Sequence, residues 1–347
     1  MLKILPSDKD GSPNAAMTLL PPKERYYPVS AYYKRRFGCR VYKVSVSVAE
    51  TCPNRAGING AGVCVFCDEW GSAAYHRTAH LGLSEQFQKN SEQIRTHYKP
   101  DQFLVYFQAY TNTFARIGQL ESQFEEALAQ RDVIGLVVGT RPDCLPGGMM
   151  ALLSRIAKRS YLSVELGLQT LDEEQLRFLS RGHDVACSLA ALEKLSAYPD
   201  IDVCVHLMFG LPGETDEQLR ATAHHLSIRG VHGVKLHNLH VLRDTPLADM
   251  YTRGEFSPVT QEDYARKVGV FLENLSPNVV VHRLNAVANR WDDIVAPDWA
   301  RSKMGTTQMI RDYLKKIDTW QGKFYPGLSK VQSVAGSLEK VMVEGGS

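Results

Sequence analysis

The chain has 347 residues, of which 44% are apolar and 22% charged, and its formal net charge is +2. This balance fits a globular protein with a large buried core, and it excludes a polycation as a whole. No run of 18 apolar residues predicts a membrane-spanning helix, and the N-terminus lacks the sustained apolar run of a signal peptide. Length alone leaves the number of domains open, because single (β/α) barrels commonly exceed about 250 residues.

The chain contains seven cysteines, an odd number for a long sequence. This count argues against a secreted disulfide scaffold and for a reducing cytosol, where clustered cysteines usually bind metal or catalyse reactions. We therefore expect a cytoplasmic protein.

Seven apolar, β-branched runs predict strands: Lys43–Ala49, Phe103–Gln108, Val133–Gly139, Tyr161–Gly167, Val203–Phe209, Val234–Leu239 and Val279–His282. The stretches between them have helical spacing, with Asp172 placed to cap one helix and Thr215 or Asp216 another. Such alternation predicts parallel βαβ units, in either a doubly wound sheet or a full or partial barrel. In both architectures ligands bind at the carboxyl ends of the strands.

The two flanks differ from this pattern. Residues 1–22 hold four prolines and few large side chains, which is typical of a mobile arm. After Leu284 the alternation ends, and Trp291, Trp299 and a helical stretch over Thr306–Lys316 predict an appended segment that packs across the main fold.

One loop concentrates cysteines immediately after the first predicted strand. Cys52 is followed after eleven residues by Cys64, and after two more by Cys67, among glycines that allow the loop to wrap a bulky group. Three thiolates can hold three irons of a four-iron cluster and leave the fourth iron open to another ligand. The alternative is a structural zinc ion with Cys39 as the fourth ligand. A strand of seven to nine residues spans roughly 25 Å, so Cys39, which precedes the strand, is a poor fourth ligand.

The remaining cysteines, Cys39, Cys144, Cys187 and Cys204, are interpreted as ordinary thiols.

The cysteine spacing, with the aromatic Phe66 before the last cysteine, resembles the cluster loop of radical S-adenosylmethionine (SAM) enzymes. The eleven-residue gap departs from their usual three-residue spacing and is similar to the YhcC-type subfamily, which is related to the radical SAM domain of the elongator catalytic subunit. The resemblance spans about residues 30 to 300 through YFQAYTNTF (106–114), VVGTRPDCLP (137–146), VELGLQT (164–170), SRGHD (180–184), HLMFGLPGET (206–215), VKLHNLHVL (234–242), HRLNAVA (282–288) and APDW (296–299).

This resemblance implies a partial (β/α)6 TIM-type barrel of the radical SAM type over residues 31–285. A flexible arm over residues 1–30 and a C-terminal extension over residues 286–347 complete the expected organisation. It also implies a [4Fe-4S] cluster on Cys52, Cys64 and Cys67, SAM on the open iron, and a one-electron donor such as flavodoxin or ferredoxin. The expected chemistry is cleavage of SAM to a 5′-deoxyadenosyl radical that abstracts hydrogen from a substrate.

The resemblance also assigns SAM contacts, each against a plainer structural role. Arg181 matches an arginine that binds the methionine carboxylate, Gln169 matches a glutamine that contacts the cofactor, and Gly210 belongs to a motif that packs against adenine. Glu165 would accept from the ribose hydroxyls or point into the barrel and pair with a base. The remaining predicted SAM contacts are Phe66, Gln108, Tyr110, Thr140 and Arg141. Lys235, His206 and His237 are interpreted as substrate contacts or satisfied core residues.

A second class of function rests on residues 23–43, which interleave aromatic and basic side chains. Stacking combined with phosphate attraction is how proteins hold single-stranded RNA. The plainer interpretation is a solvated lip that covers the bottom of the barrel. The alternative to the radical enzyme is therefore a zinc-stabilised RNA-binding barrel, and the substrate of the enzyme stays open among a tRNA base, a small metabolite and a protein.

Overall fold

The computed structural model describes residues 24–58, 60–71, 78–287 and 291–327. Its strands are β1 (Val41–Val46), β2 (Gln102–Phe107), β3 (Val133–Thr140), β4 (Tyr161–Gln169), β5 (Ile201–Phe209), β6 (Gly233–Asn238), β7 (Val241–Leu242), β8 (Val280–Arg283) and β9 (Ile294–Ala296). Its α-helices are α1 (Val29–Phe37), α2 (Leu83–Tyr98), α3 (Ile117–Leu128), α4 (Gly147–Ala157), α5 (Glu173–Phe178), α6 (Val185–Ser196), α7 (Asp216–Ile228), α8 (Pro246–Thr252), α9 (Gln261–Asn274) and α10 (Lys303–Lys316). Three short 3₁₀ helices are η2 (Pro142–Cys144), η3 (Trp291–Asp293) and η4 (Asp298–Arg301).

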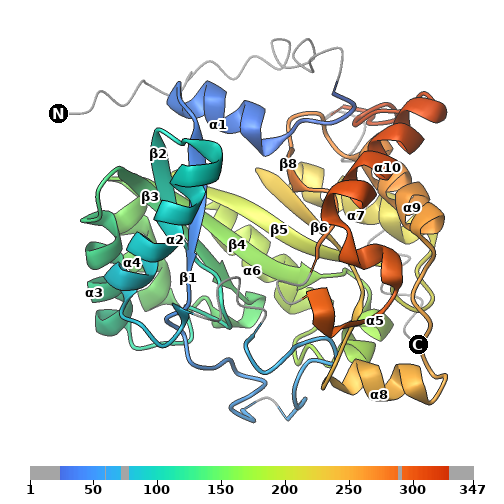
Figure 1. Cartoon of the computed structure of the whole chain (residues 1–347), viewed down its shortest axis with the longest axis horizontal. Coiled ribbons are helices and arrows are strands. Elements are labelled where there is room, and N and C mark those ends of the chain that lie inside the picture. Colours follow the sequence, from blue (N-terminus) through green and yellow to red (C-terminus); the bar gives the residue numbers. More distant parts are fainter. Residues whose placement is uncertain (1–23, 59, 72–77, 288–290, 328–347) are drawn as a thin grey trace.

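Seven parallel strands form one curled sheet in the order β1-β2-β3-β4-β5-β6-β8, with helices along its outer face (Figure 1). Each of the seven predicted runs contributes one of these strands, with ends shifted by three residues or fewer. The partial barrel is confirmed, and β8 extends it beyond six strands. β7 and β9 pair separately as an antiparallel ribbon.

Strand alternation divides the core from the barrel interior. In β4, Leu162, Val164, Leu166 and Leu168 pack into the main hydrophobic core, and the intervening side chains, including that of Glu165, face the opposite side of the sheet. β5 repeats this pattern, with valine, leucine and phenylalanine in the core and His206 on the side of Glu165. Polar groups therefore gather inside the barrel because every second position of a buried strand faces inward.

The predicted helix caps are confirmed. The side chain of Asp172 accepts a hydrogen bond from the Gln175 amide at 2.9 Å at the start of α5. Thr215, rather than Asp216, caps α7, and its partner Gln218 closes a reciprocal capping box.

Helix α1 lies across the end of the barrel opposite the loop that joins β1 to α2 (Figure 1). Tyr33 is buried there, with its ring centroid 6.5 Å from that of Tyr161 and 6.3 Å from that of His282. This helix therefore closes the amino-terminal end of the strands.

The segment after β8 packs against the main fold. α10 places Ile310 and Leu314 in the main core beside α9, and Trp299 Nε1 donates to the carbonyl of Val259 at 3.2 Å. The predicted helix over Thr306–Lys316 thus exists and begins three residues earlier. The arm predicted over residues 1–22 lies outside the described residues. No helix in the described ranges is both long and apolar enough to cross a bilayer.

Candidate active site

A cavity of about 420 Å³ opens at the carboxyl ends of the parallel strands. Its walls include Cys52, Cys64 and Cys67 from the loop after β1, together with side chains from the ends of the following strands. The other predicted contacts that line it are Phe66, Gln108, Tyr110, Thr140, Arg141, Glu165, Gln169, Arg181, His206, Lys235 and His237. Gly210 is not among the lining residues. The fold thus brings residues from seven separate sequence motifs to one place.

The three loop cysteines share this cavity, and none of the other four cysteines lines it. Cys64 Sγ accepts hydrogen bonds from Asn54 Nδ2 at 3.3 Å and from Arg181 Nη1 at 3.5 Å. Cys67 Sγ lies 3.6 Å from Arg55 Nη2. Burial raises the pKa of the Cys67 thiol to about 11, and the hydrogen bond from Arg55 opposes this rise. The thiolate is the form that binds metal.

The loop is held to the barrel within the CxxC turn and just after it. Val65 donates its amide to the Leu179 carbonyl at 3.2 Å and accepts from the Leu247 amide at 3.0 Å. Tyr110 donates its hydroxyl to the Glu69 carbonyl at 2.6 Å, and a Cβ at Gly71 would stand only 2.4 Å from the Tyr110 ring. Glycine at position 71 therefore lets this ring press against the loop.

The geometry disfavours a closed zinc site on Cys39. Cys39 precedes β1 and its Sγ donates to Oε1 of Gln102, the first residue of β2, at 3.3 Å. It therefore lies at the end of the strands opposite the cavity. Among the described residues, the loop cysteines also do not form a triad with ligand atoms within 4.8 Å of one another. A tetrahedral zinc ion holds its sulfurs about 3.8 Å apart.

Arg181 and Gln169 meet beside Gly167 at the end of β4. Arg181 is buried and donates from Nη2 to the Gly167 carbonyl at 2.8 Å. A Cβ on Gly167 would stand 3.0 Å from Gln169 Nε2 and 3.4 Å from Arg181 Nη2, so glycine permits this approach. Gln169 has a φ of +73°, in the left-handed region, next to a register shift against β5. Strain of this kind collects at functional sites.

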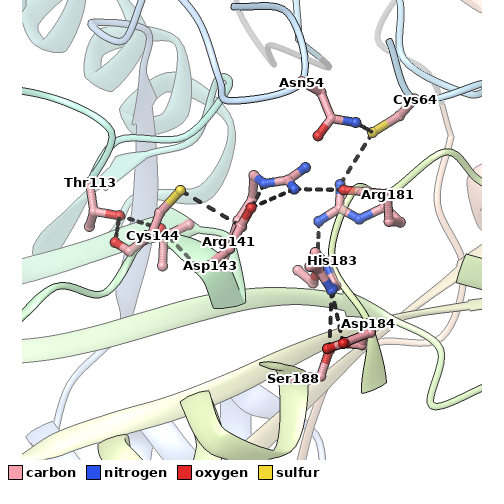
Figure 2. Close-up of polar contacts among 12 residues, drawn as sticks. Asn54, Cys64, Thr113, Arg141, Asp143, Cys144, Arg181, His183, Asp184 and Ser188 are labelled. Atoms are coloured by element: carbon pink, nitrogen blue, oxygen red, sulfur yellow. Dashed lines mark hydrogen bonds and ion pairs between the residues drawn. The ribbon is translucent and has the colours of Figure 1, made fainter. Parts of the chain in front are cut away.

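Arg141 positions Arg181 through the backbone, as Figure 2 shows. Its Nε and Nη2 bind the two oxygens of Asp143 at 2.8 and 2.9 Å, and Nη2 also donates to the Arg181 carbonyl at 2.6 Å. Burial raises the pKa of Asp143, but the bonded Arg141 outweighs it and the net pKa is lowered. The neighbouring Thr140 hydroxyl bonds that of Thr113.

Among the predicted SAM contacts that line the cavity, three buried polar atoms have no hydrogen-bond partner within the described protein. They are Gln169 Oε1, Arg141 Nη1 and Arg181 Nε. Buried polar groups are normally hydrogen-bonded, so these atoms indicate a polar ligand. Two guanidinium donors and an amide acceptor suit the carboxylate and the hydroxyl groups of SAM. The residues therefore fit this cofactor.

Glu165 is the fully buried centre of a polar network inside the barrel. Lys43 Nζ lies 2.6 Å from one of its oxygens, and His206 Nε2 lies 2.8 Å from the other, which Lys235 also contacts. Burial raises the pKa of Glu165, but the two lysines outweigh it and hold the pKa well below its ordinary value. Its oxygens are thus committed to bases, the second of the two expectations for this residue.

Burial lowers the pKa of two bases in this network. Burial lowers the pKa of Lys235 to about 8 despite Glu165. Burial also lowers the pKa of His206 to about 4, so this histidine is neutral near pH 7. Glu165, Cys204 and His282 place potential ligand atoms within 4.8 Å, but two ammonium groups on Glu165 leave no place for a cation.

One detail of the predicted RNA-binding segment needs correction. Lys43, one of its bases, lies inside the barrel on Glu165. The aromatic side chains of the same segment are all buried or half-buried, Tyr33 among them. The exposed bases Lys34, Arg35, Arg36 and Arg40 lie at the barrel end opposite the cavity. The plainer interpretation, a lip over the bottom of the barrel, fits this arrangement.

Gly210 belongs to the turn between β5 and α7. Its φ is +87°, its amide donates to Glu214 Oε2 at 2.9 Å, and Glu214 pairs with Lys267 at 3.2 Å. The glycine packs against Val259, where a Cβ would approach to 2.9 Å. This geometry accounts for the glycine within the turn itself, and an adenine contact stays a prediction.

Sequence reasoning missed Arg283 and Lys303, which also line the cavity. Arg283 belongs to the motif HRLNAVA and lies next to an inward-facing strand position. This was the only feature of the local sequence that pointed to Arg283 as a residue of the cavity.

Comparison with known proteins decides the family. The Radical SAM superfamily model matches residues 46–226, and the Radical_SAM C-terminal domain model matches residues 231–316. The chain belongs to the radical SAM superfamily. It is 34% identical over 308 residues to YtqA of Bacillus subtilis (strain 168), described as an uncharacterized protein, covering 89% of this chain and 95% of that one. It is 35% identical over 283 residues to YhcC of Escherichia coli (strain K12), covering 81% and 90%.

The superfamily fold is also visible in a solved structure. Archaeal Elp3 of Methanocaldococcus infernus, lacking its residues 1–46, superposes with a TM-score of 0.62 at 18% identity. The match covers 81% of this chain and 64% of that one, so it supports the fold alone. Radical SAM membership implies an enzyme, with a [4Fe-4S] cluster and SAM as its general cofactors and a reductant as its general requirement.

Proposed function

We propose that this enzyme holds a [4Fe-4S] cluster on Cys52, Cys64 and Cys67 and binds SAM in the adjoining cavity. The observation that carries the proposal is the grouping of these three cysteines, without a fourth, beside unpartnered buried polar atoms. Such a cluster, when bound and reduced, would supply one electron for cleavage of the sulfonium bond of SAM, giving methionine and a 5′-deoxyadenosyl radical that takes a hydrogen atom from the substrate. The electron would come from a small donor such as a flavodoxin or ferredoxin.

The protein side chains bind and orient the cofactor. Arg181 would bind the methionine carboxylate, since its Nε lacks a partner and it already neighbours Cys64. Arg141 acts as a positioning residue, because its bond to the Arg181 carbonyl fixes the backbone at that arginine. Gln169 would meet a cofactor hydroxyl through its unpartnered Oε1. Glu165 is left to hold the lysines of the barrel interior.

The substrate would enter the same cavity on the side of β6 and β8, where Lys235 and His237 face it. No observation favours the alternative zinc-stabilised RNA-binding barrel. The aromatic side chains of the segment proposed to bind RNA are buried or half-buried, and the exposed bases of that segment lie at the end of the barrel opposite the cavity.

Anaerobic reconstitution with iron and sulfide, followed by reduction and addition of SAM, tests the proposal. We expect iron uptake with a brown colour, a change in the EPR spectrum of the reduced cluster on adding SAM, and formation of 5′-deoxyadenosine. Cys52→Ala should lose the cluster and SAM cleavage together. Cys39→Ala is the matched control, because Cys39 lies at the opposite end of the barrel and should keep both.

Two results would overturn the proposal. One is a colourless wild-type protein that takes up zinc in place of iron and forms no 5′-deoxyadenosine. The other is a Cys52→Ala variant that retains a full cluster. Some radical enzymes cleave SAM only with substrate bound, so the EPR change on adding SAM tests cofactor binding independently of turnover.

A further inference from the structure

Arg283, the last residue of β8, reaches the cavity without a carboxylate partner. Its Nη2 lies 2.9 Å from His237 Nδ1, and its buried Nε has no partner within the described protein. Burial lowers the pKa of His237 well below its ordinary value, and the nearby Arg283 lowers it further. Burial lowers the pKa of Arg283 as well, and the guanidinium bonds to an imidazole and to no carboxylate of the described residues.

The carboxylates inside the barrel are committed elsewhere. Glu165 is shared by Lys43 and Lys235. Asp202, near the base of the barrel, accepts from the hydroxyls of Tyr32 and Tyr161 and does not line the cavity. Burial of a charge is unfavourable unless the charge is paired. The described part of the protein therefore supplies no anion that pairs with Arg283.

Lys303 adds a second cation to the same wall. It opens α10, lines the cavity and makes no ion pair with any described residue. Arg283 and Lys303 both line the cavity. Burial lowers the pKa of Lys303, and repulsion from Arg283 lowers it further. Asp68 and Asp293 also line the cavity, and no ion pair joins either of them to Arg283 or Lys303 in the described ranges. Two neighbouring cations without a carboxylate between them favour an anion.

SAM does not account for this second anion site. SAM carries one carboxylate, which the proposed function assigns to Arg181 after β4. β8 lies three strands from β4, or about 14 Å at the usual spacing of neighbouring strands. A separate acidic molecule would place its charge at Arg283 while its reacting carbon lies toward the cofactor.

We propose that Arg283 and Lys303 form the subsite for an acidic group of the substrate, which is a small carboxylic acid or phosphate ester. This inference rests on the proposed function for the identity of the reaction. A guanidinium presents two parallel donors that match two oxygens of either group. The cavity of about 420 Å³ also holds SAM in the proposed function, so the space that remains for the substrate selects a compact acid.

Calorimetric titration of the anaerobically reconstituted, SAM-loaded protein tests the subsite, with inorganic phosphate and acetate as two separate probes. Sodium chloride at matched ionic strength corrects for general salt effects. We expect saturable binding of at least one probe, and the stronger probe identifies the acidic group. Arg283→Met and Lys303→Ala should each weaken that binding at least tenfold. Arg253→Met is the matched control, because Arg253 is exposed and pairs only with Glu255 at 2.7 Å.

Three outcomes would overturn the subsite. They are binding of neither probe to the wild-type protein, binding to Arg283→Met as tight as to the wild type, and an equal loss in Arg253→Met. Lys303 lies at an exposed helix start, so Lys303→Ala keeps the test valid if Arg283→Met fails to fold. If neither small anion binds, and single-stranded RNA binds saturably and more weakly to Arg283→Met, the ligand of this subsite is RNA and the proposal of a small acid is wrong. Binding that depends on Arg283 in a protein without iron would retain the subsite and remove the radical reaction.

Discussion

The network around Glu165 allows a quantitative test by Glu165→Gln. The wild-type carboxylate is fully buried and compensates the ammonium groups of Lys43 and Lys235. An amide of nearly the same shape keeps the packing and leaves two buried cations without a counter-charge. Breaking a buried ion pair by removing one partner costs about 3–5 kcal/mol. We therefore expect Glu165→Gln to lower the free energy of unfolding by about that amount at pH 7.

The pH dependence of this loss follows from Lys235. In the wild-type protein its pKa is about 8, below its ordinary value, so stability rises as the pH increases through 8. Glu165 raises the pKa of Lys235, and its removal makes this lysine lose its proton at a lower pH. The loss of unfolding free energy in Glu165→Gln should therefore be smaller at pH 9.5 than at pH 6.5. The pKa of Glu165 itself is depressed, so its own contribution is constant above the ordinary carboxyl range.

Denaturant unfolding followed by circular dichroism at both pH values measures these differences. Glu255→Gln is the control, because Glu255 is exposed and pairs with Arg253 at the surface, where solvent screens the interaction. An unfolding free energy of Glu165→Gln equal to that of the wild type would refute the reasoning. A deficit that is the same at pH 6.5 and pH 9.5 would refute the part that concerns Lys235.

Three further predictions concern the cofactor side and the fold. Arg141→Ala removes the hydrogen bond to the Arg181 carbonyl, so the SAM affinity measured by equilibrium dialysis should fall about tenfold or more. The iron content should stay at the wild-type level, and loss of iron would instead indicate a structural role. Gln169→Gly relieves the strain of a left-handed backbone conformation, so it should raise the free energy of unfolding by about 1 kcal/mol. The same variant should bind SAM more weakly, and an unchanged SAM affinity would contradict the proposed contact. Thr215→Ala breaks the capping box with Gln218 and should cost about 1 kcal/mol in denaturant unfolding, with no effect on the iron content.

The sequence contained the elements and the class of the site. Strands could be predicted because buried parallel strands need continuous β-branched runs, and the Asp172 and Thr215 caps because a short polar side chain must satisfy the first helical amides. The cysteine loop was equally local, since all three cysteines lie within sixteen consecutive residues, Cys52 to Cys67. Features that depend only on residues close together in the chain can therefore be predicted from the sequence.

Tertiary structure decided which side chains meet. Periodicity left open a barrel or an open sheet, because that choice depends on how neighbouring strands twist and close. Lys43 looked like a surface base and lies on Glu165, 122 residues away, since β1 and β4 turn these positions toward one interior. Arg283 and His237 meet across β8 and β6 in the same way. Pairing between inward-facing positions of distant strands is set by sheet register and curvature, and no local pattern in the chain encodes either one.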